Sequence, residues 1–176
     1  MVKAVEIRPL RRDDDRNAFS CGQADLDRFF AHYAGQNQFK LHLAVTYVAV
    51  VFGRIVGFAT VAASSLERAS IPSARLRRRL PGYPLPVLRL ARLGVDTRAQ
   101  GLGIGKALLR HVLALAIEQR DKLGCVGVVT DAKSGAVRFY EALGFMPLEG
   151  AREGLLAGEP LPMFLGIQTI ASTMPR

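Results

Sequence analysis

Three glycines alternate within the stretch Thr97–Leu109, TRAQGLGIGKALL, where a strand-like run gives way to a helix-like run. A glycine inside a helix costs about 1 kcal/mol relative to alanine, so Gly101, Gly103 and Gly105 need a physical reason. Either the backbone turns too tightly here for a side chain, or a large ligand lies against bare backbone. The two explanations imply different functions.

Phosphate-binding loops are the first ligand-binding explanation to compare with this stretch. A Walker A loop needs GxxxxGK[ST], but Gly105-Lys106 is followed by Ala107, so the hydroxyl that binds Mg²⁺ is missing. A dinucleotide-binding fingerprint needs GxGxxG, whereas the spacing here is GxGxG. A pyrophosphate cradle at a helix N-terminus fits better, because free N–H groups and the helix dipole favour an anion there. A tight turn without any ligand stays open at this point.

The cradle pattern leads to a family resemblance. Arg98, Gly101 and Gly103 match R/QxxGxG/A, the acetyl-CoA-binding motif of the GNAT superfamily of N-acetyltransferases. The preceding strand ends in RLGVD, and AVRFYEALGF, residues 136–145, resembles the second signature of that family. The resemblance covers nearly the whole chain. It implies an α/β (α+β) fold with a mixed, mostly antiparallel central sheet flanked by helices, a splayed strand pair that binds acetyl-CoA, and one domain over residues 1–176.

The same resemblance implies roles for individual residues. Tyr140 would face the cofactor sulfur and protonate the departing CoA thiolate as a general acid. Ala136 and Phe139 are expected to pack around the cofactor or in the core rather than to take part in chemistry. The residues expected to bind acetyl-CoA are Leu93, Gly94, Val95, Arg98, Gln100, Gly101, Leu102, Gly103, Ile104, Gly105, Lys106, Ala136 and Phe139.

Four segments together resemble a narrower group, the acetyltransferase toxins of bacterial type II toxin–antitoxin pairs. They are FSCGQADLDRFF (19–30), TYVAV (46–50), PGYPLPVLRLARLGVD (81–96) and QGLGIGKALL (100–109). This resemblance implies acetylation of the amino acid on charged tRNA, a block of translation, and neutralisation by a ribbon-helix-helix antitoxin with an acidic tail. Two alternatives stay open: an acetyltransferase for a small amine or a protein N-terminus, and a non-catalytic module that binds acyl-CoA or nucleic acid.

The charge distribution indicates a polyanionic partner. The net charge is +9, and the span 28–92 contains ten Lys or Arg and one acidic residue, Glu67, so it carries the whole excess. Such asymmetry favours nucleic acid or an acidic protein as partner, although a solvated basic face without a partner is the alternative. The candidate contacts to tRNA phosphates are Arg75, Arg77, Arg78, Arg79, Arg89 and Arg92.

No general base is evident from the sequence. Many family members that act on basic amines carry a glutamate near the strand before the loop, where this chain offers Arg89 and Arg92, and Asp96 is expected to belong to the turn. A lysine amine of pKa about 10.4 is almost fully protonated at pH 7, whereas an α-amine of pKa about 7.7–8.0 is partly neutral. We therefore expect an α-amine substrate, which needs little help to lose its proton.

The remaining features exclude several classes of protein. No apolar run is long enough to span a membrane, and the N-terminus lacks the apolar core of a signal peptide. Cys21 and Cys125 are too few for a disulfide framework and are expected to be packing residues, and His32, His42 and His111 share no metal-ligand spacing, so no metal is expected. These observations favour a cytoplasmic protein without membrane attachment; a homodimer stays open.

Hydrophobic periodicity predicts the elements that position these motifs. We expect strands near 5–10, 44–52, 54–63, 87–95, 125–131, 145–148 and 162–170, and helices over 23–36, 106–124 and 134–144. Residues 64–86 are expected to form a loop, with Pro72 opening a short helix that carries arginines.

Overall fold

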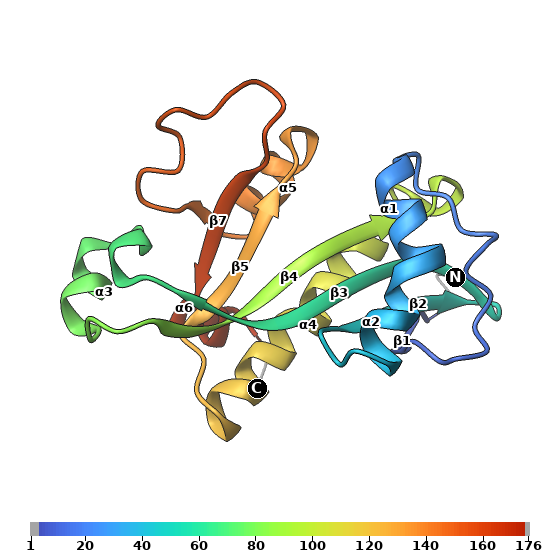
Figure 1. Cartoon of the computed structure of the whole chain (residues 1–176), viewed down its shortest axis with the longest axis horizontal. Helices are drawn as coiled ribbons and strands as arrows, with labels where there is room; N and C mark the ends of the chain where they lie inside the picture. Colours follow the sequence, from blue (N-terminus) through green and yellow to red (C-terminus); the bar gives the residue numbers. More distant parts are fainter. Residues whose placement is uncertain (1–3, 175–176) are drawn as a thin grey trace. The chain divides into compact units, whose positions relative to one another are not determined.

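The computed structural model describes residues 4–174 and contains, within that range, a seven-stranded sheet flanked by helices (Figure 1). The order of hydrogen-bonded strands is β1-β2-β3-β4-β5-β7-β6. The strands are β1 (Glu6–Pro9), β2 (Val45–Val51), β3 (Arg54–Leu66), β4 (Leu85–Val95), β5 (Gly127–Ala132), β6 (Met146–Pro147) and β7 (Leu161–Gly166). The pairs β1–β2, β2–β3, β5–β7 and β6–β7 are antiparallel. The predicted fold class is confirmed, while the splay of the strand pair stays a prediction.

The long helix after the glycine stretch has the predicted place and stop signal. The helices are α1 (Ala24–Arg28), α2 (Ala34–Phe39), α3 (Ala74–Arg79), α4 (Ile104–Lys122), α5 (Val137–Ala142) and α6 (Ile167–Thr173). Helix α4 starts two residues earlier than predicted and ends before Gly124, whose positive φ of 99° suits a helix terminator. Among the described residues, no helix combines the length and apolar character needed to span a membrane.

The chain divides into two compact units. Unit 1 runs as far as Ala62 and includes Leu90–Val112; unit 2 comprises Ala63–Arg89 and the chain from Leu113 onward. Strands β3 and β4 and helix α4 therefore contribute residues to both units. The single domain over residues 1–176 stays a prediction.

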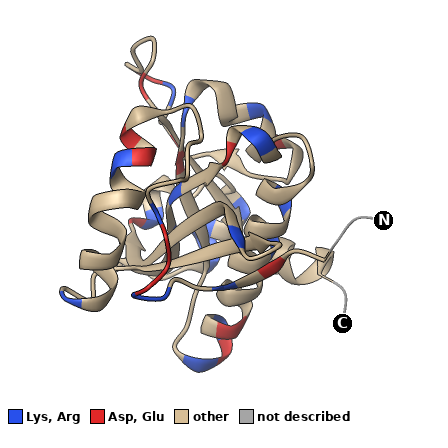
Figure 2. Cartoon of the chain, turned by 90° about the vertical axis from the view of Figure 1, so that its right-hand side faces the viewer, with Lys and Arg blue, Asp and Glu red and all other residues tan. Residues whose placement is uncertain are grey.

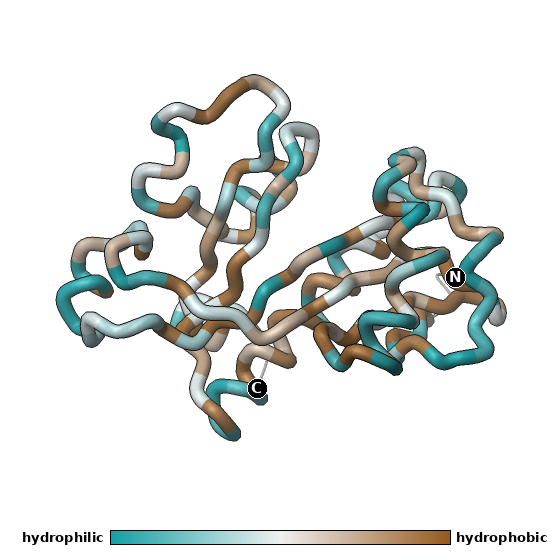
Figure 3. Tube along the Cα trace, in the orientation of Figure 1, coloured by the Kyte–Doolittle hydropathy of each residue, from teal (hydrophilic) through white to brown (hydrophobic). Residues whose placement is uncertain are grey.

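Unit 1 has an aromatic core. The Phe30 ring is fully buried and stacks on Phe58, with ring centroids 4.5 Å apart, and Phe19 meets both rings edge-on. Such aromatic pairs add about 0.5–1.5 kcal/mol each beyond the burial of their surface. Figure 3 shows hydrophobic positions, in brown, recurring along the strands. This core supports the end of β4, from which the glycine stretch follows.

Unit 2 has a separate aliphatic core with one phenylalanine. It consists of Leu66, Ile71, Leu85, Val87, Val129 and Phe164. Val129 of β5 lies opposite Phe164 of β7 in the antiparallel register. The antiparallel pairing of β5 with β7 thus brings both residues into this core.

Four predicted boundaries are wrong. Strand β3 continues to Leu66 and β4 begins at Leu85, so the predicted loop over 64–86 is shorter at both ends. Its helix α3 is opened by Ser73, whose hydroxyl accepts a hydrogen bond from Leu76 N, and not by Pro72. The last predicted strand stops at Gly166, because the following residues form helix α6.

Candidate active site

The glycine loop between β4 and α4 contains two residues with left-handed backbone. Gly101 has φ 79° and Gly103 has φ 84°, and a Cβ built on either would meet no atom within 4 Å. Crowding by protein atoms is therefore not the reason that glycine occupies these positions. The left-handed backbone requires glycine, and the space that a side chain would occupy is open. Gly105 differs, since it lies in the first turn of α4.

The N-terminus of α4 presents backbone donors toward the loop. The first N–H groups of a helix have no partner within the helix, and the dipole of this 19-residue helix favours an anion there. The Ile104 side chain is buried: a Cβ at Gly57 of β3 would lie 2.8 Å from it. Ile104 can therefore offer a ligand only its backbone. Leu102 and Lys106 are exposed.

The end of β4 brings Leu93, Gly94 and Val95 up to the loop. A Cβ at Gly94 would approach the Phe58 ring to 3.0 Å and Cys21 Sγ to 3.5 Å. Core packing therefore explains this glycine, and only the Gly94 backbone could meet a cofactor. Leu93 and Val95 are half-buried.

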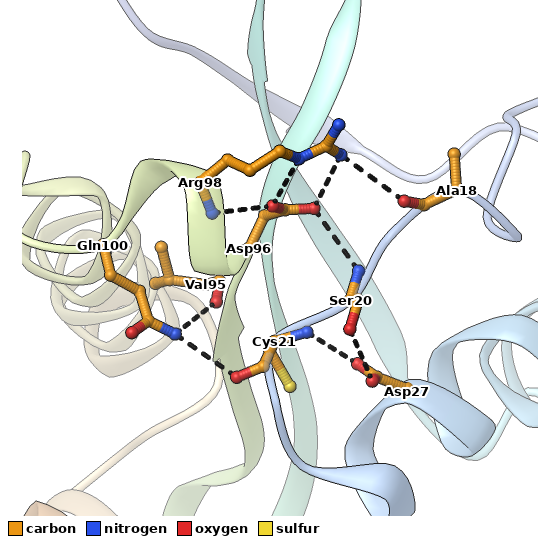
Figure 4. Close-up of polar contacts among 8 residues, drawn as sticks. All are labelled: Ala18, Ser20, Cys21, Asp27, Val95, Asp96, Arg98 and Gln100. Atoms are coloured by element: carbon orange, nitrogen blue, oxygen red, sulfur yellow. Dashed lines mark hydrogen bonds and ion pairs between the residues drawn. The ribbon is translucent and has the colours of Figure 1, made fainter.

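Asp96 is a buried carboxylate at the start of the loop (Figure 4). Its Oδ1 accepts hydrogen bonds from Arg98 N and Nε, both at 3.0 Å, and its Oδ2 accepts from Arg98 Nη2 at 3.2 Å and from Ser20 N at 3.3 Å. The hydrogen bonds and positive charge of Arg98 lower the pKa of this carboxyl to about 2, although burial opposes the shift. Arg98, a predicted cofactor-binding residue, is thus held by a bidentate pair and remains 61 % exposed.

Gln100 fixes the loop from its other side. Its Nε2 donates to Cys21 O at 3.2 Å and to Val95 O at 3.1 Å. Both acceptors are backbone carbonyls, so the Gln100 side chain links the backbone at Cys21 to the backbone at Val95. Of the predicted cofactor residues in this loop, Arg98 and Gln100 shape it, and the glycines supply its conformation.

Tyr140 lies in unit 2, on helix α5. The ring is 5 % exposed and packs edge-on against Phe139 and Phe145, with centroids 5.1 and 5.3 Å away. Burial raises the pKa of the phenol above its usual value, and a hydrogen bond with Thr130 of β5 opposes that shift. A phenol of raised pKa stays protonated at neutral pH and can therefore donate a proton. Ala136 and Phe139, which precede Tyr140 in the same motif, are half-buried.

The predicted tRNA-binding arginines fall into two groups. Arg75, Arg78 and Arg79 are exposed on α3. The others make contacts within the protein: Arg77 with Ile71 O and Pro72 O and with Glu149 at 3.7 Å, Arg89 with Asp131 at 3.2 Å and Ser64, and Arg92 over the Phe29 ring at 4.4 Å. Figure 2 shows acidic residues, in red, interleaved with basic ones, in blue. Arg77 in particular acts as a brace for the start of α3.

A cavity of about 460 Å³ lies beside α3 in unit 2. Its lining includes Arg75 and Arg79 together with apolar side chains such as Leu76, Phe164 and Ile167. Two of the three exposed arginines of α3 therefore line a cavity that also has apolar side chains, while Arg78 does not line it.

Sequence reasoning missed the residues that organise the loop. The sequence predicts only that Asp96 belongs to the turn and gives no sign of Ser20, because their pairing across 76 positions has no local signal. His111, whose spacing in the sequence suits no metal site, packs against Tyr47, and its buried Nε2 has no hydrogen-bond partner within the described part of the chain. Within residues 4–174, no group of three or more His, Cys, Asp or Glu is placed to hold a metal ion. Cys21 and Cys125 are buried free thiols, as predicted.

Comparison with known proteins gives four informative similarities. Residues 42–147 match the acetyltransferase (GNAT) domain family. A tRNA-acetylating toxin of Mycobacterium tuberculosis is 34% identical over 127 residues, which cover 72% of this chain and 75% of the relative. The structure "AtaT complexed with acetyl-methionyl-tRNAfMet" is 26% identical with a TM-score of 0.82, covering 96% of this chain and 98% of that one. "Crystal structure of AtaTR bound with AcCoA" is 26% identical with a TM-score of 0.76, covering 96% of both chains.

Proposed function

The chain belongs to the GNAT acetyltransferase family, and from this premise we propose that it is a toxin that transfers an acetyl group from acetyl-CoA to the α-amine of aminoacyl-tRNA. The similarity to the mycobacterial tRNA-acetylating toxin carries this proposal, because it spans three quarters of that relative. Acetylation of the α-amine removes the nucleophile that peptide-bond formation requires, so translation stops. Acetylation of a small amine or a protein N-terminus is not favoured by these relatives.

The glycine loop is suited to hold the pyrophosphate of acetyl-CoA. Gly101 and Gly103 leave open space where side chains would stand, and the first N–H groups of α4 supply donors to an anion. When bound, acetyl-CoA supplies the acetyl group as a thioester. The binding residues named from the sequence, from Leu93 to Lys106, remain part of this proposal, with contributions from Gly94 and Ile104 limited to the backbone.

Tyr140 is the proposed general acid. The substrate amine attacks the thioester carbonyl, a C–N bond forms and the C–S bond breaks, and the Tyr140 hydroxyl gives its proton to the departing sulfur. Solvent then returns a proton to the phenolate and accepts the proton that the amine loses. The buried phenol suits this role because its raised pKa keeps it protonated.

We propose further that the exposed arginines of α3 contact tRNA phosphates, and that a ribbon-helix-helix antitoxin with an acidic tail neutralises the toxin. The excess positive charge between residues 28 and 92 supports both partners. A cytoplasmic location follows from a tRNA substrate, and a homodimer remains compatible with this function.

The test uses purified protein, radiolabelled acetyl-CoA and charged tRNA. We expect N-acetyl-aminoacyl-tRNA as product, with no label on uncharged tRNA. Expression without an antitoxin should arrest growth by blocking translation. Efficient acetylation of polyamines or protein lysines with charged tRNA untouched would replace this substrate assignment.

A further inference from the structure

A short segment from the N-terminal part of the chain lies against the glycine loop. We call Ala18–Cys21 the strap. Its backbone carbonyls accept hydrogen bonds from the loop: Arg98 Nη2 to Ala18 O at 3.5 Å and Gln100 Nε2 to Cys21 O at 3.2 Å (Figure 4), and also Thr97 N to Ser20 O at 2.9 Å. All these residues belong to unit 1. The first residues of the loop are therefore held by hydrogen bonds to the strap backbone.

Asp96 joins the strap to the loop. Its side chain is 3 % exposed, and its oxygens accept from Ser20 N on the strap and from Arg98 on the loop. A buried carboxylate is stable only when it is paired and hydrogen-bonded, so its partners have little freedom to move. Asp96 thereby fixes the Arg98 guanidinium through its Nε and Nη2 atoms (Figure 4).

The strap is itself anchored at its other side. Asp27 of α1 accepts hydrogen bonds from Cys21 N at 2.8 Å and from Ser20 Oγ at 3.2 Å. Between these contacts, the Phe19 ring packs edge-on against Phe30 and Phe58 in the aromatic core. The strap therefore has both a polar and an apolar attachment to the body of unit 1.

We propose that Asp96 is a positioning residue for acetyl-CoA binding: it locks Arg98 and the strap together, so that the glycine loop is held in its binding conformation before the cofactor arrives. This inference rests on the proposed function of the loop. Asp96 touches no cofactor atom itself; it acts through Arg98 and through the loop backbone. Asp27 supports the same arrangement from α1.

The glycines explain why the loop needs contacts that restrict its conformation. Gly101 and Gly103 have no side chain to restrict their backbone, so an untied loop would sample many conformations. Ordering it on binding would lower affinity, whereas a loop already ordered binds without that loss. The lock should therefore affect acetyl-CoA binding far more than the chemical step.

The test compares Asp96→Asn with a matched control, Asp14→Asn. Asp14 also forms a bidentate pair, with Arg8 at 2.8 Å, and also accepts a backbone N–H, that of Arg11, and these partners belong neither to the strap nor to the loop. Both variants lose the same kind of interaction. Asp27→Ala is the second test variant, because it loosens the strap while Asp96 stays intact.

Calorimetry with acetyl-CoA, steady-state kinetics, melting temperature and hydrogen exchange of residues 97–103 are measured for each protein. We expect Asp96→Asn to weaken acetyl-CoA binding about tenfold or more, the loss expected for hydrogen bonds to a charged group. KM for acetyl-CoA should rise while kcat at saturation is retained, and loop exchange should accelerate. Asp27→Ala should change the same quantities in the same direction and to a smaller extent.

The control separates positioning from general destabilisation. Asp14→Asn should lower the melting temperature and leave KM for acetyl-CoA and loop exchange at wild-type values. Unchanged acetyl-CoA affinity in folded Asp96→Asn and Asp27→Ala overturns the positioning role while the proposed function stands. A wild-type protein that does not bind acetyl-CoA overturns both.

Discussion

Gly101 and Gly103 show what a single residue type can reveal. The sequence left two explanations for them, a tight turn or a ligand against bare backbone, and the structure supports a joint answer. Their positive φ angles require glycine for the turn, and the open space around both leaves room for a ligand. The same conformational demand occurs at Gly53 in the β2–β3 turn, which has φ 72° and is also uncrowded.

Gly53 therefore provides a matched control for the loop. Gly103→Val and Gly53→Val each force a branched side chain into a left-handed backbone, a strain of about 1–3 kcal/mol. Both should lower the melting temperature by similar amounts. Only Gly103→Val should abolish acetyl-CoA binding by calorimetry, because its side chain fills the space proposed for the pyrophosphate. Equal affinity in the two variants would remove the cofactor from this loop.

Tyr140 allows a sharper test of chemistry at the residue scale. Tyr140→Phe keeps the buried ring and removes the hydroxyl, so kcat should fall by roughly 10²–10⁴-fold with acetyl-CoA affinity nearly unchanged. Tyr83→Phe, which alters an exposed ring, is the control and should keep the wild-type rate. Wild-type turnover in Tyr140→Phe would mean that water protonates the sulfur.

The pH profile adds a second readout for Tyr140. A general acid is active below its pKa, and burial raises the pKa of this phenol above its usual value of about 10. The rate should therefore show no loss from deprotonation of the acid between pH 7 and its raised pKa. A descending limb near neutrality that disappears in Tyr140→Phe would contradict the raised pKa.

At the scale of elements, periodicity predicted the sheet and the long helix because their signals are local. Alternating or continuous apolar runs marked the strands, and Gly124 marked the end of α4. The helix predicted over 23–36 was also found, but it is interrupted by a π-helical turn, Phe29–Tyr33. Such turns are rare single-turn features inside α-helices, and the helical spacing of apolar residues does not distinguish them.

The residues of the candidate site also differ in whether a local sequence pattern predicts them. The glycines and Tyr140 could be named from motifs, whereas the role of Asp96 depends on Ser20, far away in the sequence. Arg77 shows another limit of a local pattern: a run of arginines predicts a common phosphate-binding role, which for Arg77 stays a prediction. In the fold, helix geometry turns Arg77 toward the carbonyls of Ile71 and Pro72, while its neighbours on α3 stay exposed.

The arginines of α3 are therefore expected to differ in their effects on tRNA binding and on stability. Replacing Arg75, Arg78 and Arg79 by Gln should weaken tRNA binding and flatten its log–log salt dependence by about 0.9 per lost phosphate contact. The melting temperature should stay near wild type, because these side chains are exposed. Arg77→Gln should instead lower the melting temperature, since it loses a brace. Salt titrations of tRNA binding and thermal unfolding measure both effects.

The control for α3 is Arg120→Gln. Arg120 is an exposed arginine at the end of α4, paired with its neighbour Asp121. Its loss removes one positive charge from another element, to be compared with each single arginine replacement on α3, and should leave the salt slope of tRNA binding unchanged. An equal change in the salt slope for each arginine removed, on α3 or on α4, would mean that α3 acts on tRNA binding only through its contribution to net charge.

At the scale of the whole molecule, two properties have to be explained together: a net charge of +9, and a strand before the loop that carries Arg89 and Arg92 rather than a glutamate. In the fold, Arg89 pairs with Asp131 and Arg92 covers Phe29, so neither can remove a proton from the substrate amine. A substrate that brings its own neutral amine and its own negative charge accounts for both properties. Aminoacyl-tRNA has these two features.

The pH dependence of the acceptor reaction tests this account. At pH 7 a lysine-like amine of pKa about 10.4 is neutral in roughly one molecule in 2,500, and an α-amine of pKa about 7.7 in roughly one in six. We expect kcat/KM for aminoacyl-tRNA to rise with pH only until the substrate amine is neutral and then to level off. The inflection should move when the amino acid on the tRNA is changed to one with a different α-amine pKa, because the titrating group belongs to the substrate. It should stay in place in Asp96→Asn, since that carboxylate, with a pKa of about 2, is ionised throughout this range. An inflection that is the same for all amino acids would identify a general base on the protein, and the α-amine argument would then lose its basis.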